Sequence, residues 1–364
     1  MMKKKLGIFL ALILVVLLAF GVCSCAQKED KGAAEGTEGT EGTEEPAGPK
    51  EMITLRLVVP APVGDELTDK DIEMAERFNA RAKEYGYQID VHGGGSLVNV
   101  TEYLDAVRTG AVEIFDAAPP IYAGKDPRLN GLILPFLFES GEAILAAHTD
   151  LEELYSKEIF EPDFNQKILG LLFCGYFDLF NTKRAIRAPE ELQGLLIGAP
   201  DPGIAAIVEL FGATSIMVAW PDFYSSLDKG VIDGILNSPN GTINNKLTDI
   251  VKYFTDTLVP PSINVYSINL DVWNAMPAEV QQMLHEEIQN TCISFSEHYI
   301  QQHDKDIETL RGLGVDVTLL TDEERDKFRQ KCLGYTDEQL ASYESGFGEK
   351  LKAIAYKANQ EAGK

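Results

Sequence analysis

The chain has 364 residues, and its 57 acidic and 32 basic side chains give a formal net charge of −25. A surface of this sign repels nucleic acid and anionic lipid, so we exclude both as partners of the folded part and assign the acidity to solubility. The length is sufficient for two lobes with separate hydrophobic cores.

Residues 1–24 are typical of an export signal. Lysines at positions 3 to 5 precede an uncharged apolar run from Leu6 to Val22, which is short for a membrane span but suits a secretory signal. The run ends in Cys23-Ser24-Cys25, and the small Ser24 favours Cys25 over Cys23 as a lipoprotein cleavage and lipid-attachment site. An uncleaved anchor and an ordinary secretory signal are the alternatives. Each of the three places the remainder outside the cytoplasm, in the periplasm or at the outer face of the cell membrane.

Residues 25–50 form an acidic segment rich in Gly, Thr and Glu, in which the triplet Glu-Gly-Thr recurs from Glu35, Glu38 and Glu41. Because such a segment cannot bury apolar area, we predict a disordered tether.

Strands and helices alternate along the body of the chain. A strand over 53–59 precedes a helix that is capped near Thr68 and ends at Gly86. The later predicted strands cover 87–92, 112–117, 195–199, 215–218 and 231–236, with a long apolar crossing strand over 168–180. Helices between them, such as 100–109 and 203–211, imply parallel sheets with covered faces.

The C-terminal part is helical. The region from Pro277 to about Leu313 contains no helix breaker, and at ~1.5 Å per residue it could exceed roughly 40 Å, enough to brace two lobes. Shorter helices follow over about 322–331 and 337–357. We therefore predict a two-lobed α/β fold like that of periplasmic binding proteins, with crossing strands and a long bracing helix. The predicted parts are lobe I (51–174 and about 264–302), lobe II (175–263 and about 303–340) and a C-terminal helix (341–364).

No motif marks catalysis, a cofactor or a metal. The sequence contains no GxSxG, P-loop or HExxH, and His298 and His303 are spaced so that they do not share a helix face. Cys174, Cys292 and Cys332 show no paired spacing. We interpret Cys174 as a buried thiol, and one disulfide between the other two is the alternative.

Several short stretches, taken in order, resemble one family of transport proteins. They are Leu134-Pro135-Phe136-Leu137-Phe138, Asn181-Thr182-Lys183-Arg184-Ala185-Ile186, Pro189-Glu190-Glu191-Leu192-Gln193-Gly194, Phe223-Tyr224-Ser225-Ser226-Leu227 and Gly230-Val231-Ile232-Asp233-Gly234. Their order and spacing resemble the solute-binding subunit of tripartite ATP-independent periplasmic (TRAP) transporters, the DctP family. The resemblance implies a small organic solute bound between two α/β lobes and delivered to a two-part, ion-driven membrane permease.

Two positions depart from the family pattern. The resemblance implies an arginine for the ligand carboxylate in the strand after the short helical turn, where this chain has Gly198. In the family, a second arginine is common in the crossing strand. The closest alignment of this chain to that pattern places Asp178 at the position of this arginine. Glycine offers no side chain and an aspartate repels a carboxylate, so an anionic acid is a doubtful ligand.

Asp178 has three interpretations. It binds a cationic or hydroxyl-rich ligand, or it pairs with a neighbour such as Lys183 or Arg184, or the register is shifted by a residue or two. Arg184 remains a candidate carboxylate ligand by a different geometry, although its matched position implies a structural role.

Four further residues complete the predicted ligand site. Trp220 stands where the family often places an aromatic against the ligand, and a core position at a helix start is the alternative. Asn237 ends a strand and can orient a polar ligand, or it forms a turn before Ser238-Pro239. Tyr176 and Phe177 either line the cleft near Asp178 or are buried.

These observations predict an extracytoplasmic receptor that binds a small organic solute without catalysis or cofactor and delivers it to a TRAP permease. A ligand-sensing input for a signalling receptor is the alternative. An enzyme on the same frame is disfavoured, because no nucleophile–base pair is evident.

Overall fold

The computed structural model describes residues 52–363, which form one compact unit. The predicted export signal (1–24), the tether (25–50) and the lipid attachment at Cys25 lie outside the described residues. Every helix within residues 52–363 is too short or too polar to cross a membrane.

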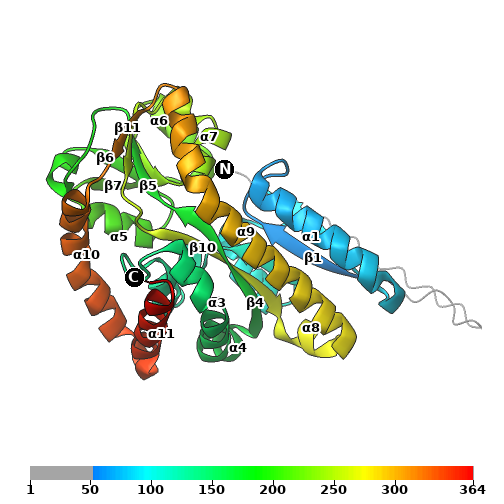
Figure 1. Ribbon diagram of the computed structural model, residues 1–364. Coiled ribbons are helices and arrows are strands. Elements are labelled where there is room, and N and C mark those ends of the chain that lie inside the picture. Colours follow the sequence, from blue (N-terminus) through cyan, green and yellow to red (C-terminus); the bar gives the residue numbers. More distant parts are fainter. Residues whose placement is uncertain (1–51, 364) are drawn as a thin grey trace, which may run out of the picture. The chain divides into compact units, whose positions relative to one another are not determined.

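Two β-sheets organise the compact unit into two α/β lobes, as predicted (Figure 1). In spatial order, the five-stranded sheet of lobe I contains β2 (Tyr87–Gly93), β1 (Ile53–Val59), β3 (Ile114–Ala117), β10 (Pro261–Asn269) and β4 (Gln166–Tyr176). The six-stranded sheet of lobe II contains β11 (Asp316–Leu319), β9 (Tyr253–Asp256), β5 (Asp178–Asn181), β8 (Gly234–Asn237), β6 (Leu196–Ala199) and β7 (Thr214–Met217).

The prediction of purely parallel sheets was wrong. Strand β10 runs antiparallel to β3 and β4, and β5 runs antiparallel to β8 and β9. The physical reason is the connection between the lobes. The chain enters lobe II along β4 and returns beside it along β10, so the returning strand must run in the opposite direction.

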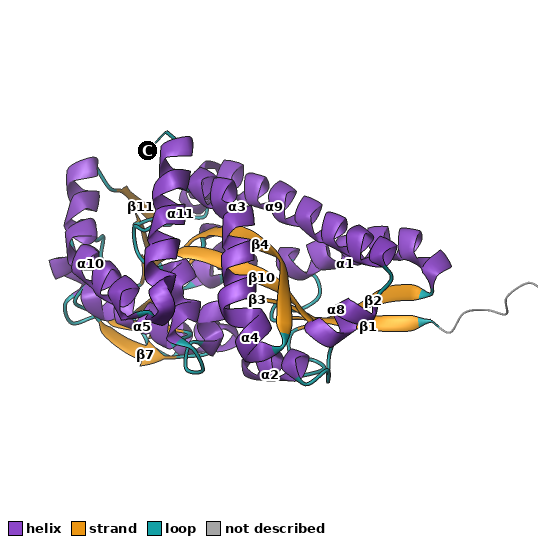
Figure 2. Cartoon of the chain, turned by 90° about the horizontal axis from the view of Figure 1, so that it is seen from below, coloured by secondary structure: helices purple, strands orange, loops and turns teal. Residues whose placement is uncertain are grey.

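Helices cover both faces of each sheet (Figure 2). They are α1 (Glu66–Ala82), α2 (Tyr103–Arg108), α3 (Gly141–Tyr155), α4 (Glu161–Phe164), α5 (Pro202–Leu210), α6 (Phe223–Asp228), α7 (Pro239–Asn244), α8 (Leu270–Ala275), α9 (Ala278–Gly312), α10 (Asp322–Ser342) and α11 (Phe347–Glu361). Successive side chains of a strand point to opposite faces of its sheet, so each sheet separates two hydrophobic cores. In β1, Leu55 and Leu57 pack toward α1 and α9, whereas Val58 packs toward α2 and α3.

The predicted crossing strand is divided in two. Strand β4 ends at Tyr176 in lobe I and β5 begins at Asp178 in lobe II, so Phe177 is the crossing residue. The return crossing runs from the end of β9 to Pro261. The two crossings lie side by side, because the Phe177 amide donates to the carbonyl of Pro260 at 2.8 Å.

The predicted long helix is confirmed as α9, which has 35 residues. Leu284 and Ile288 near its start are buried in the core of lobe I, and Ile307 and Leu310 near its end are buried in the core of lobe II. Figure 1 shows α9 extending along both lobes. Helix α9 therefore braces the two cores.

The last two helices differ from the prediction. We expected a break near Gly334, but α10 continues through it to Ser342. Cys332 and Thr336 are buried on either side of this glycine, and their packing keeps the helix continuous. The three cysteines of the described part are free and buried, so the alternative of a disulfide between Cys292 and Cys332 was wrong.

Gly234 allows β5 and β8 to approach, and its replacement tests this packing. A Cβ at this position would lie 2.3 Å from the carbonyl oxygen of Phe180. We expect Gly234→Ala to lower the free energy of unfolding by at least ~2 kcal/mol in chemical denaturation. Gly124→Ala is the control, because a Cβ there meets open space, and its effect should stay within about 0.5 kcal/mol. Equal effects of the two variants would contradict this interpretation.

Candidate functional site

A cavity of about 470 Å³ is lined by residues of both lobes. In each lobe, three parallel strands end at it. The residues that follow these strands and line the cavity are Pro60, Gly94 and Ala118 in lobe I and Pro200, Trp220 and Ser238 in lobe II. The carboxyl ends of parallel strands are the usual ligand-binding edge of an α/β sheet. The crossing residue Phe177 and Tyr299 of α9 complete the wall.

Trp220 and Asn237 form one hydrogen-bonded unit in the wall of lobe II. The indole Nε1 donates to Asn237 Oδ1 at 3.4 Å, and Asn237 Nδ2 donates to Thr242 Oγ1 at 3.1 Å. Asn237 is the last residue of β8, and Trp220 begins the 3₁₀ turn Trp220–Asp222, with Pro221 at its start. These two bonds fix the orientation of the Asn237 amide, and Trp220 lines the cavity beside it.

The structure brings together three of the seven predicted ligand residues. Trp220, Asn237 and Phe177 line the cavity. Tyr176, Asp178, Arg184 and Gly198 are absent from its wall. Their role as ligand contacts is not supported by this geometry.

Three of these four residues have clear structural roles. Tyr176 packs edge-on against Phe173, with ring centroids 5.2 Å apart. Arg184 donates to the carbonyls of Glu191 and Gln193 at 2.7–3.0 Å and so fixes a surface turn. A Cβ at Gly198 would lie 2.7 Å from Ile232, so a side chain there would enter the core of lobe II.

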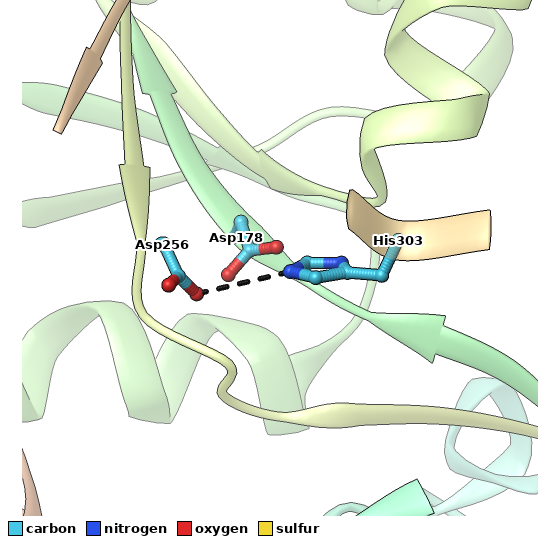
Figure 3. Close-up of side chains that lie close together, drawn as sticks. All are labelled: Asp178, Asp256 and His303. Atoms are coloured by element: carbon cyan, nitrogen blue, oxygen red, sulfur yellow. Dashed lines mark ion pairs between the residues drawn. The ribbon is translucent and has the colours of Figure 1, made fainter. Parts of the chain in front are cut away.

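Asp178 lies at the junction of the lobes and is fully buried. Its Oδ1 accepts from the Leu258 amide at 2.7 Å, and Figure 3 shows it beside Asp256 and His303. Burial, and next the charge of Asp256, raise the pKa of Asp178 well above its usual range. The suggested partners pair elsewhere: Lys183 with Asp233 at 3.0 Å, and Arg184 with the backbone.

The charged groups that line the cavity are acidic. Among the described residues, no lysine, arginine, histidine or glutamate contributes to its wall, whereas Asp65 and Asp201 do. Asp65 caps α1 through the Leu67 amide at 3.0 Å, and Asp201 caps α5 through the Ile204 amide at 2.9 Å. Burial raises the pKa of both carboxyl groups.

Neither aspartate was predicted as a ligand residue. The first helix cap was predicted near Thr68, and the predicted ligand residues did not include a helix cap. Each aspartate follows a predicted strand within a few residues and precedes a helix, which is the N-cap pattern that could have found them. Asn264 of β10 and Tyr299 of α9 also line the cavity. No local sequence pattern marked these two residues as cavity residues. The return strand that carries Asn264 was not predicted, and the helix that carries Tyr299 is polar along most of its length.

One hydrogen bond joins the lobes at the cavity margin. Asn240 of α7 lines the cavity and donates to Glu66 Oε2 of α1 at 3.0 Å. Glu66 Oε1 lies 3.0 Å from His298 Nε2 of α9. This contact closes lobe II against lobe I.

Two α/β lobes, paired crossings and a cavity at their strand ends define the class of two-lobed solute-binding receptors. Residues 66–342 match the family described as bacterial extracellular solute-binding protein, family 7 (DctP), and the chain belongs to this family. The resemblance found in the sequence is thus confirmed. Members are solute receptors rather than enzymes, act outside the cytoplasm and work with membrane permease subunits.

Individual relatives are distant in sequence. The 2,3-diketo-L-gulonate-binding periplasmic protein YiaO of Escherichia coli is 24% identical over 72% of this chain and 80% of its own length. The ectoine/5-hydroxyectoine-binding periplasmic protein UehA of Ruegeria pomeroyi is 22% identical over 73% and 80%, respectively. The solved structure of DctP7, a Bordetella pertussis receptor binding pyroglutamic acid, has a TM-score of 0.77 at 19% identity and covers 84% of this chain and 99% of its own.

Replacement of Trp220 tests the predicted ligand contact. We expect Trp220→Ala to remain folded but to lose the rise in melting temperature that a bound solute causes, because the apolar platform over the cavity is removed. Differential scanning fluorimetry with and without solute measures this. Trp273→Ala is the control, because Trp273 is half-buried on α8 outside the cavity. An unfolded Trp220→Ala protein would favour the core alternative.

Proposed function

We propose that this receptor binds a small organic solute that carries no carboxylate, either neutral or cationic. The observation that carries the proposal is the composition of the cavity wall, where the carboxyl groups of Asp65 and Asp201 are present and no cationic side chain of residues 52–363 is present. A carboxylate entering this cavity would lose its hydration without gaining a guanidinium or ammonium partner. Negative charge on Asp65 or Asp201 would also repel the carboxylate of the ligand.

The nearest buried lysine is not free to supply the missing charge. Lys70 of α1 binds Asp71 at 2.9 Å, Asp116 at 2.6 Å and the Tyr266 hydroxyl at 2.8 Å. Burial opposes the charged form, but the charges of Asp116 and Asp71 and the hydrogen bonds to them raise the pKa of Lys70 overall. Turning Lys70 toward a ligand would leave two buried carboxylates without their cation, at a cost of several kcal/mol.

The remaining wall suits a partly apolar solute with a few polar groups. Trp220 offers an aromatic face for stacking or for a cation, and the amide of Asn237 offers a fixed donor and acceptor. YiaO and DctP7 are named for organic acids, so this chain would differ from them in ligand charge. A cavity of this volume fits a molecule of metabolite size.

The family supports delivery of the solute to a membrane permease, in preference to a signalling role. We propose that Cys25 carries the lipid anchor and that residues 25–50 tether the receptor near the permease. The residue pattern around Cys25 supports this assignment.

A thermal-shift screen of organic acids, neutral polyols and amines tests the ligand class. We expect the largest shift from a carboxylate-free solute, equivalent to ~2.7 kcal/mol at a hundredfold excess over its dissociation constant. If simple dicarboxylates gave the largest shift, the proposed ligand class would be wrong, whereas the receptor assignment would stand.

Neutralising the cavity aspartates separates a cationic from a neutral ligand. Asn caps helices as well as Asp does, so Asp201→Asn and Asp65→Asn should fold normally. For a cationic solute, we expect each variant to weaken binding about 10-fold in calorimetry, because a favourable charge is lost. For a neutral solute, the affinity should change by less than about 3-fold. Tighter binding of a carboxylate by wild type than by either variant would contradict the proposal.

A further inference from the structure

Three of the segments that connect the lobes, the two crossings and α9, each place an ionisable side chain at one buried point. Asp178 begins β5 directly after the outgoing crossing, and Asp256 ends β9 directly before the return crossing. His303 lies on α9 between the part buried in lobe I and the part buried in lobe II. One oxygen or ring nitrogen from each of the three lies within 4.8 Å of the others (Figure 3).

Each carboxylate has one oxygen held by the protein and one left free. Asp178 Oδ1 accepts from the Leu258 amide, and Asp256 Oδ2 accepts from Arg325 at 3.1 Å. The other oxygens, Asp178 Oδ2 and Asp256 Oδ1, are buried and have no hydrogen-bond partner. Buried polar atoms are rarely left in this state, because each costs the full desolvation penalty.

The two buried carboxyl groups share one cationic hydrogen-bond partner. Asp178 is fully buried and Asp256 is only 8% exposed. Arg325 compensates one of the two carboxylates through its contacts with the side chain and carbonyl of Asp256. Among the described residues, no cationic side chain donates a hydrogen bond to the two free oxygens, Asp178 Oδ2 and Asp256 Oδ1, beside which His303 lies.

We propose that Asp178, Asp256 and His303 form a binding site for one divalent cation of the Zn²⁺ type, between the crossings of the two lobes. Two carboxylate oxygens and one imidazole nitrogen are a ligand set that such ions accept, with water in the fourth position. The hydrogen bonds from Leu258 and Arg325 to the outer oxygens are the supporting contacts that orient metal-binding carboxylates.

Binding requires a small rearrangement. Two ligands with bonds of ~2.1 Å can be at most ~4.2 Å apart, and the three ligand atoms here lie within 4.8 Å of one another. His303 Nε2 now lies 3.9 Å from Asp256 Oδ1, and its side chain is 21% exposed, so it is the group that can move inward. Because the ligands come from both crossings and from α9, an ion would couple these three connections and stiffen the junction of the lobes.

A titration with Co²⁺, as a visible reporter for Zn²⁺, tests the site in the full chain. We expect saturation at one Co²⁺ per chain with ligand-field absorption, and displacement by Zn²⁺. Absorption from thiolate ligation would be absent, which separates this site from Cys23 and Cys25. Asp178→Asn and His303→Gln should each weaken binding by ~100-fold, because each removes a direct ligand.

His285→Gln is the matched control, since His285 also pairs with a carboxylate, Glu152 at 3.1 Å, but lies outside the site. Its affinity for Co²⁺ should equal that of wild type. His303→Gln alters a partly exposed residue and keeps the test decisive if Asp178→Asn fails to fold. The proposal is overturned if no saturable binding occurs, if only thiolate absorption develops, or if His303→Gln binds like wild type. A proton on Asp178 would then be the sole compensation of the buried charge.

Discussion

The hydrogen bond from the Phe177 amide to the Pro260 carbonyl is the constraint on which the two-lobed arrangement depends. It holds the outgoing and returning crossings side by side, so β4 and β10 pair in lobe I while β5 and β9 pair in lobe II. The carboxyl ends of both sets of parallel strands then face one cavity. Phe177 belongs to its wall and Asp178 to the buried cluster beside it, so ligand site and hinge are adjacent in sequence.

The cavity combines a two-lobed architecture with a wall in which the described residues supply aspartates but no cationic side chain. Its aspartates cap α1 and α5, so their position follows from helix formation as well as from any role toward a ligand. The carboxylates in the wall and the commitment of Lys70 to Asp71 and Asp116 point to the same ligand class. Two independent observations therefore support a solute without a carboxylate.

The elements predicted best from the sequence are those with strong local patterns. The bracing helix α9 has no breaker over 35 residues, and the strands after glycine turns have clear apolar runs. The antiparallel return strand β10 was missed, because its direction depends on pairing with β4, which is far away in the sequence. The same limit applies to the site. Trp220 and Asn237 were found from their motifs, whereas Asn264 and Tyr299 reach the cavity only through tertiary packing.

The surroundings of Asp178 could not be predicted for a similar reason. The residue matches the position of a family arginine along the strand, but a single sequence cannot show that Asp256 and His303 converge on it. Gly198 likewise lies against Ile232 in the core, although the resemblance placed it at the ligand. Position along a strand can be predicted from spacing, whereas the direction of a side chain relative to a distant loop cannot.

The cavity wall is made largely of segments that follow strands, and this has a consequence for how new specificities arise. The strand ladders and the paired crossings carry the stability of the frame, and most of the wall lies outside the ladders. Substitutions in these loops can therefore alter the recognised molecule while the frame persists. This separation agrees with relatives that share under a quarter of the matched residues with this chain and are named for chemically different metabolites.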